Sequence, residues 1–303
     1  MRAFYSDHFV LPLPEGHRFP MAKYSGLRAR IVEDRIICPA DLHEAPAATW
    51  DELRLVHTAE YVDAIATGTV GRDIQRRIGF PWSPAMVERS RRSVGATIAA
   101  ARAALEDGVS ANLAGGTHHS FADRGEGYCV FNDVAVAARV LQRDRLARRI
   151  AIVDLDVHQG NGSAAIFQGD DDVFTFSMHG EKNFPFKKET SDLDVALPDG
   201  MGNEGYLSAL NEHLPAVLNT HRPDFVFYLA GADPYEGDRL GRLKLTIEGL
   251  RERDAMVFDV CRSAGLPIAV TMSGGYAADM DAIVTIHSNT IRLAQACRST
   301  FVS

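Results

Sequence analysis

The chain has 303 residues, 46% hydrophobic and 24% charged, so it can bury a large core without disulfide bonds or structural metals. Its 40 acidic and 32 basic residues give a net charge of −8, which argues against a nucleic-acid partner. No apolar run approaches the length of a membrane span, the N-terminus lacks the apolar core of a signal peptide, and the four cysteines show no Cys-x-x-Cys spacing. We therefore expect a cytoplasmic protein with free thiols and no membrane partner.

Helices alternate with strands from about residue 87 onward. In chain order we expect a helix over 87–105, a strand over 111–114, a helix over 132–141, strands over 150–157 and 173–178, a helix over 203–218, a strand over 224–229, a helix over 246–260, a strand over 267–272 and a closing helix. Asn132, Asn203 and Thr246 are candidate N-caps. This alternation predicts a parallel sheet that is covered by helices on both faces.

Polar residues follow four of the predicted strands at the point where each strand ends. The four segments read GGTHH (115–119), DLDVH (154–158), AGAD (230–233) and SGGY (273–276). In parallel sheets, ligands bind beyond the carboxyl ends of the strands. We therefore expect all four segments to lie along one edge of the sheet, where they would form a functional site.

A metal site is the first interpretation of this edge. Asp156 and His158 are two residues apart, and on a strand such residues share a face. Asp233 could supply a third ligand from another strand end. Three protein ligands leave a fourth position open, as catalytic zinc sites require. The alternative for each residue taken singly is that it caps a strand end and bonds to loop amides.

Proton-transfer groups are expected beside this metal. His118 and His119 follow two glycines, which let the backbone turn sharply. If both rings faced the metal, they could move protons to and from a bound water and a leaving group. Tyr276 could donate a hydrogen bond to an oxyanion. The alternatives are an incidental histidine pair and an ordinary half-buried tyrosine.

The motifs GGTHHS, GYCVFND, DLDVHQGNG, GADPYEGD and SGGY, in this order, resemble the zinc-dependent histone deacetylase family. The segments HRFPMAKY, GFPWSP and HQGNG look more like class IV and its bacterial relatives. The resemblance implies one arginase/deacetylase-like domain over residues 1–303, with a three-layer α/β/α architecture around a central parallel sheet of about eight strands. It also implies a hydrolase that removes acetyl or longer acyl groups from Nε-acyl-lysine of proteins or from related acylated amines.

The resemblance implies a role for each residue of the site. Zinc is expected on Asp156, His158 and Asp233, and Fe²⁺ could replace it because such mixed ligands select weakly. His119 would be the main general base and acid, His118 would stay largely cationic, and Tyr276 would complete the oxyanion hole. A structural potassium ion is expected near Asp154, Asp156, His158, Ser177 and Met178.

Two residues are expected to support the histidine pair. Asp154 would bond to His118 and favour its charged form. Asn161 would bond to His119, at a position where class I enzymes carry aspartate. An amide does not stabilise the imidazolium as a carboxylate would, so our hypothesis is that His119 is mostly neutral near pH 7.

The resemblance also places the walls of an acyl-lysine channel. Tyr128 stands where the family usually has phenylalanine, which puts the preferred acyl chain in question. For the basic residue of a product-exit channel, Lys23 is a candidate. The expected substrate-binding residues are Gly127, Tyr128, Phe184, Gly274 and Gly275.

Three other functions are consistent with parts of the pattern. An acylpolyamine or small-metabolite amidohydrolase would use the same site. A dimanganese ureohydrolase would share the fold but needs more ligands, and Asp154 is the only surplus acid. A non-catalytic acyl-lysine reader would keep the fold and bind without turnover. Oligomeric state is not predicted.

Overall fold

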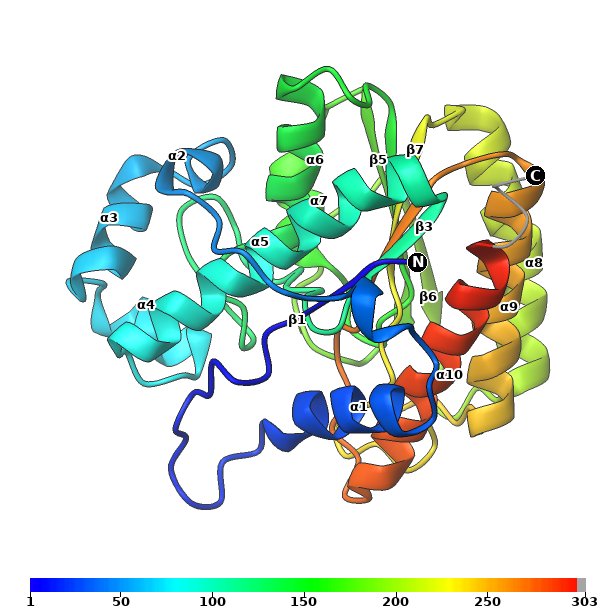
Figure 1. The fold of residues 1–303 in the computed structure, drawn as a ribbon, viewed down its shortest axis with the longest axis horizontal. Coiled ribbons are helices and arrows are strands. Elements are labelled where there is room, and N and C mark those ends of the chain that lie inside the picture. Colours follow the sequence, from blue (N-terminus) through cyan, green and yellow to red (C-terminus); the bar gives the residue numbers. More distant parts are fainter. Residues whose placement is uncertain (299–303) are drawn as a thin grey trace.

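One parallel sheet forms the centre of the computed structural model, which describes residues 1–298. Its eight strands lie in the order β2-β1-β3-β8-β7-β4-β5-β6, and all neighbouring pairs are parallel (Figure 1). The strands are β1 (Ala3–Tyr5), β2 (Leu42–Glu44), β3 (Val109–Asn112), β4 (Ile150–Asp154), β5 (Val173–Gly180), β6 (Leu193–Leu197), β7 (Phe225–Leu229) and β8 (Ile268–Thr271). The prediction of a parallel sheet of about eight strands is confirmed.

Helices connect these strands. They are α1 (Ala22–Glu33), α2 (Trp50–Leu53), α3 (Ala59–Thr67), α4 (Arg72–Ile78), α5 (Pro84–Asp107), α6 (Asp133–Arg143), α7 (Asn161–Phe167), α8 (Asn203–His221), α9 (Ile247–Ser263) and α10 (Met280–Arg298). Within residues 1–298, none of them is long and apolar enough to cross a membrane.

Helices cover both faces of the sheet, as the alternation of side chains along β4 shows. Ala151 and Val153 belong to the apolar core beneath α8, α9 and α10, whereas Ile150 and Ile152 belong to the core beneath α5 and α6. Figure 1 shows α8, α9 and α10 grouped on one side of the strands and α5 and α6 on the other. The architecture therefore has the expected three layers.

Side-chain caps fix the start of two predicted helices. Asn132 accepts a hydrogen bond from the Ala135 amide at the start of α6, and Thr246 accepts one from Gly249 at the start of α9. The prediction for Asn203 was wrong by one residue, because Gly202 precedes α8. The Asn203 side chain instead accepts from the backbone of Thr246 and donates to its hydroxyl, and so joins two helix starts.

Strand β4 is shorter than the predicted strand 150–157 because it ends at Asp154. The Asp154 carboxylate accepts a hydrogen bond from the Asp156 amide, and Asp156 accepts one from the His158 amide. Such side-chain contacts with the amide two residues further on form turns and end the extended backbone. Asp156 and His158 therefore lie in the loop after β4.

The start of α6 is held by a buried histidine. His57 lies between α2 and α3, its Nε2 accepts the Asn132 amide, and its Nδ1 donates to the carbonyl of Phe121, each at 3.0 Å. Burial lowers the pKa of His57 from 6.5 to about 4. A neutral ring fits this position, because one nitrogen must accept while the other donates.

We expect this histidine to make the fold sensitive to acid. Its folded pKa is lower than its unfolded pKa, so its contribution to stability is present above pH 6.5 and is lost as the pH falls toward 4. Between pH 7 and pH 5 the loss amounts to about 2 kcal/mol. We therefore expect the His57→Gln variant to be less stable than the wild type at pH 7. The difference between their free energies of unfolding, measured with urea, should shrink by about 2 kcal/mol at pH 5. A deficit that stays constant over this range would contradict the assignment.

Candidate active site

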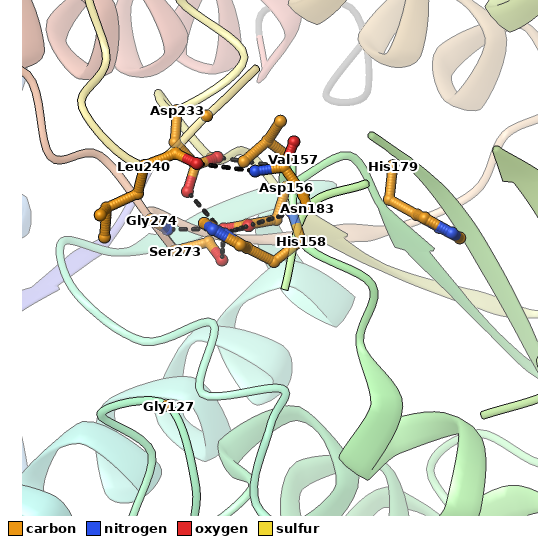
Figure 2. A network of polar contacts seen from close by, with 12 residues as sticks. Gly127, Asp156, Val157, His158, His179, Asn183, Asp233, Leu240, Ser273 and Gly274 are labelled. Atoms are coloured by element: carbon orange, nitrogen blue, oxygen red, sulfur yellow. Dashed lines mark hydrogen bonds and ion pairs between the residues drawn. The ribbon is translucent and has the colours of Figure 1, made fainter. Parts of the chain in front are cut away.

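Three buried side chains meet beyond the carboxyl ends of β4 and β7. Asp156, His158 and Asp233 each place one potential ligand atom within 4.8 Å of the others, and no other such group occurs among residues 1–298. His158 Nδ1 lies 2.9 Å from Asp156 Oδ1 and 3.2 Å from Asp233 Oδ2. Figure 2 shows the three side chains pointing toward one another.

Backbone and hydroxyl donors hold one part of each carboxylate. Asp156 Oδ2 accepts from the hydroxyl of Ser273 at 2.7 Å and from the amide of Gly274 at 2.8 Å. Asp233 Oδ1 accepts from the Val157 amide at 2.9 Å. A Cβ at Gly274 would lie 1.8 Å from Asp233 Oδ2, so this approach requires glycine.

A buried arginine of α9 bonds to both of the loops that carry Asp156 and Asp233. Arg253 of α9 is fully buried, and its Nη1 donates to the carbonyl of Gly231 at 2.7 Å and to that of Leu155 at 3.4 Å. Gly231 follows β7 and Leu155 follows β4. One guanidinium therefore sets the spacing between the two ligand-bearing loops.

The group is electrostatically suited to a cation. Burial and the charge of Asp156 raise the pKa of Asp233 to about 6. Burial alone would lower the pKa of His158, but the two carboxylates raise it to about 10. Asp233 Oδ2 is buried, yet it accepts no hydrogen bond from the described residues. A divalent cation between these atoms would satisfy both carboxylates, and two aspartates with one histidine are a donor set that holds zinc.

His118 and His119 lie next to the Asp156–His158–Asp233 group, and each of these two rings bonds to a different partner. Their ring centroids are 4.1 Å apart, and His118 Nε2 lies 3.9 Å from Asp156 Oδ1. His118 Nδ1 is 2.6 Å from Asp154, the last residue of β4. His119 Nδ1 is 2.7 Å from the side-chain oxygen of Asn161, the first residue of α7. Both expected pairings are present.

These partners give the two rings opposite electrostatic character. Burial opposes a charge on His118, but the carboxylates of Asp154 and Asp156 outweigh it and raise the pKa of His118 to about 9. Burial lowers the pKa of His119 well below its usual value, and the positive charges of His118 and His158 lower it further. At neutral pH the histidine pair therefore combines a cationic imidazole, His118, with a neutral one, His119.

A residue to which the sequence analysis assigned no role orients Asn161. Its Nδ2 donates to Glu126 Oε1 at 3.1 Å, so its oxygen must face His119. An oxygen at that position requires a proton on His119 Nδ1 and leaves the lone pair on Nε2. Glu126 thus selects the tautomer of His119 through Asn161.

The loop that carries the histidines is anchored by Asp133. This fully buried carboxylate accepts hydrogen bonds from the amides of Gly116 and Thr117 and from the hydroxyls of Thr97 and Thr117, all at 2.6–3.0 Å. The motif GYCVFND contains Asp133, but a motif does not reveal which loop its carboxylate will bond.

Tyr276 is clamped by the loop that follows β7. Its amide donates to Asp238 at 2.6 Å, and its carbonyl accepts from Arg239 at 2.7 Å. The ring centroid lies 6.2 Å from that of His158. Burial raises the pKa of Tyr276 well above 10, and the charges of Asp156 and Asp233 add to this effect. The phenol keeps its proton and can donate a hydrogen bond.

Gly127, Tyr128 and Phe184 line an open cavity that leads to the group. The Phe184 ring lies edge-on to His119, with centroids 4.9 Å apart, and a Cβ on Gly127 would meet the His119 ring at 2.6 Å. The Tyr128 ring packs 6.1 Å from Tyr276. Gly127, Tyr128 and Phe184 therefore lie around one cavity that also reaches His119 and His158.

A second cavity is lined by His118 and His119 and also by the buried side chain of Arg89. The lining does not include Lys23, whose ammonium donates to the carbonyls of Ser273 at 3.0 Å and Gly275 at 3.5 Å. Arg89 is therefore the better candidate for a basic residue in an inner channel. Of the two glycines expected to contact the substrate, Gly274 donates its amide to Asp156 and Gly275 accepts from Lys23 through its carbonyl.

Of the residues expected to hold potassium, Asp154, Ser177 and Met178 lie on two adjacent strands, whereas Asp156 and His158 lie in the loop after β4. Asp154 of β4 pairs in register with Ser177 of β5, and Met178 follows in that strand. The Ser177 hydroxyl lies 3.0 Å from His179 Nδ1.

Comparison with known proteins now identifies the family. Residues 17–291 match the histone deacetylase domain. The chain belongs to the histone deacetylase family. It is 31% identical to the histone deacetylase-like amidohydrolase of Pseudomonas aeruginosa over 83% of this chain and 68% of that one. An uncharacterized protein of Picosynechococcus sp. is 48% identical over 96% of this chain and 97% of the relative.

A solved structure supports the same conclusion. The crystal structure of a histone deacetylase homologue complexed with SAHA superposes with a TM-score of 0.85 at 25% identity, and covers 97% of this chain and 84% of that one. The fold is thus of the arginase/deacetylase type, and membership of the histone deacetylase family makes the chain a hydrolase of the deacetylase and amidohydrolase kind.

Proposed function

We propose that this histone deacetylase family member is a zinc-dependent hydrolase that removes acyl groups from Nε-acyl-lysine of proteins. The observation that carries the proposal is the position of His119 beside the buried Asp156–His158–Asp233 group. Its ring centroid lies 5.9 Å from that of His158, and its bond to Asn161 leaves Nε2 free. A channel walled by Gly127, Phe184 and Tyr128 suits a long, thin and uncharged acyl-lysine side chain.

Asp156, His158 and Asp233 would hold the metal. A zinc ion bound there supplies polarisation of the acyl carbonyl and a lower pKa for water. Iron(II) could take its place, since these oxygen and nitrogen ligands discriminate weakly. A structural potassium ion near Asp154, Asp156, His158, Ser177 and Met178 is a further part of the proposal.

His119 is the proposed general base and general acid. Its Nε2 accepts the proton of the attacking water and then delivers it to the leaving lysine nitrogen. His118, held cationic by Asp154, offers a fixed positive charge to the anionic transition state. Tyr276 donates its hydroxyl proton in a hydrogen bond to the oxyanion that develops on the acyl carbonyl. Gly274 and Gly275 would help to border the substrate.

The rival functions differ in what they require of the site. A dimanganese ureohydrolase needs a second cluster of ligands, whereas Asp154 is engaged by His118, and residues 1–298 hold one candidate group. A non-catalytic reader would bind acyl-lysine without turnover. We retain a single domain over 1–303 and class IV as proposals, the latter on the motifs HRFPMAKY, GFPWSP and HQGNG.

The direct test is turnover of an acetyl-lysine reporter peptide. Activity should disappear when the metal is removed with a chelator and return when zinc is added in stoichiometric amount. Asp233→Ala should abolish both the activity and the zinc-induced rise in melting temperature. Peptide binding without turnover in the zinc-loaded protein would favour the reader and refute the hydrolase.

Removal of the Tyr276 hydroxyl tests its proposed role. Tyr276→Phe should lower kcat by about 10²–10³-fold, which is the cost of losing one oxyanion donor. Tyr235→Phe is the matched control, because Tyr235 also lies in a loop that follows a strand, β7, but does not line the cavities that reach the site. If Tyr276→Phe were as active as the wild type, Tyr276 would have no part in the chemistry.

The link from Glu126 to His119 predicts that the effect of Glu126→Ala on activity depends on whether residue 161 is asparagine or aspartate. Asn161→Asp places a carboxylate on His119, raises the pKa of that ring and moves the acidic limb of the kcat/KM profile to higher pH. In the native background, Glu126→Ala should lower kcat about 10-fold, because Asn161 loses its anchor. In the Asn161→Asp background the same change removes a repelling carboxylate and should not lower activity. An unmoved pH profile in Asn161→Asp would refute the assignment of His119.

A further inference from the structure

Basic side chains surround the opening of the active-site cavity, although acidic residues outnumber basic ones by 40 to 32 in the whole chain. The open cavity and a smaller hollow beside Tyr276 are lined by six arginine and lysine residues, and Glu126 is the only acid among residues 1–298 that lines them. We call these residues the basic mouth: Arg18, Arg76, Arg77, Lys182, Arg239 and Arg242.

The basic mouth is built from four separate segments. Arg18 lies in the loop before α1, Arg76 and Arg77 lie on α4, and Lys182 lies in the loop after β5. Arg239 and Arg242 belong to the loop between β7 and α9. Positive charges therefore come to the opening from four separate segments, and a substrate that enters the cavity passes close to them.

These charges are only partly neutralised. Arg76 pairs with Asp73 at 2.9 Å and Arg242 with Asp199 at 3.1 Å, both at exposed positions where water screens the pair. Glu126, the one acid in the lining, pairs with Arg77 at 3.6 Å and also accepts a hydrogen bond from Asn161, so it offsets one charge of the mouth. Lys182 and Arg18 form no hydrogen bond or ion pair through their side chains within the described part of the chain, and they leave net positive charge at the opening.

We propose that the substrate is an acyl-lysine in an acidic stretch of protein, a proposal that rests on the proposed function and narrows it. An acylated lysine is neutral, so the charge felt by the mouth comes from flanking residues within the screening length of about 10 Å. Acidic flanks complement the basic mouth, whereas polyamines and lysine-rich tails are repelled by it.

An exposed aromatic side chain favours a peptide over a small molecule. Phe186 is 87% exposed at the rim, and its ring centroid lies 6.3 Å from that of Phe184. A large apolar side chain beside the opening can pack against a chain that extends beyond the acyl-lysine itself. Small acylated amines would not reach it.

The test compares peptides that differ only in the residues around one acetyl-lysine. The zinc-loaded full chain is assayed on acidic, uncharged and basic versions at low and high salt, with an N-acetylated polyamine as a fourth substrate. We expect kcat/KM to be at least about 10-fold higher for the acidic peptide than for the basic one at low salt, with the gap closing as salt screens the charges. The polyamine should be the poorest substrate.

Charge reversals locate the effect. Arg76→Glu and Lys182→Glu should each reduce the ratio of kcat/KM for the acidic peptide to that for the basic peptide. Arg262→Glu is the control: Arg262 also pairs with an acid three residues earlier on its own helix, Asp259 at 3.2 Å, but lies at the far end of α9. This control should leave the ratio unchanged.

Equal rates for the acidic and basic peptides, or faster turnover of the basic one, would overturn the inference. Binding of the same labelled peptides to zinc-loaded Tyr276→Phe separates it from the proposed function. Tighter binding of the acidic peptide without turnover by the native protein would uphold the basic mouth and refute the hydrolase. If the acidic and basic peptides bound equally tightly, the proposed preference for acidic flanks would be refuted, whether or not the native protein turns them over.

Discussion

Two carboxylates buried side by side, with an imidazole between them, are the constraint to which the rest of this site responds. Asp156 and Asp233 are almost completely inaccessible to water, where like charges repel strongly and solvation is lost. The protein offsets part of that cost with amide and hydroxyl donors from the loops after β4 and β8. One oxygen is left facing His158, and the demand for a cation follows from it.

Neighbouring groups then divide the chemistry by their charge. A carboxylate beside His118 and an amide beside His119 give two chemically identical rings opposite protonation at neutral pH. The sign of the charge also differs between the buried site and the cavity opening, because two acids belong to the candidate metal group while basic residues line the opening. An acyl-lysine would therefore approach past positive charges and react beside negative ones.

The sequence predicted the ends of β3, β4, β7 and β8 well enough to bring the site residues to one edge. It could not predict why Asp156 and His158 converge, because they lie beyond β4 and meet through turns rather than through the two-residue repeat of a strand. The roles of Asp133 and Glu126 depend on partners 16 and 35 residues away, and local spacing carries no information on such contacts. Strands β1 and β2 have three residues each, too few to show a periodic pattern.

The distribution of these contacts along the chain has a consequence for biosynthesis. Asp156 depends on Ser273 and Gly274, and the two ligand-bearing loops are spaced by Arg253. During translation Asp156, His158 and Asp233 are made before Arg253, Ser273 and Gly274, the residues that position them. A nascent polypeptide that has not reached residue 274 therefore lacks these donors, and the group takes its final geometry only after that segment has left the ribosome.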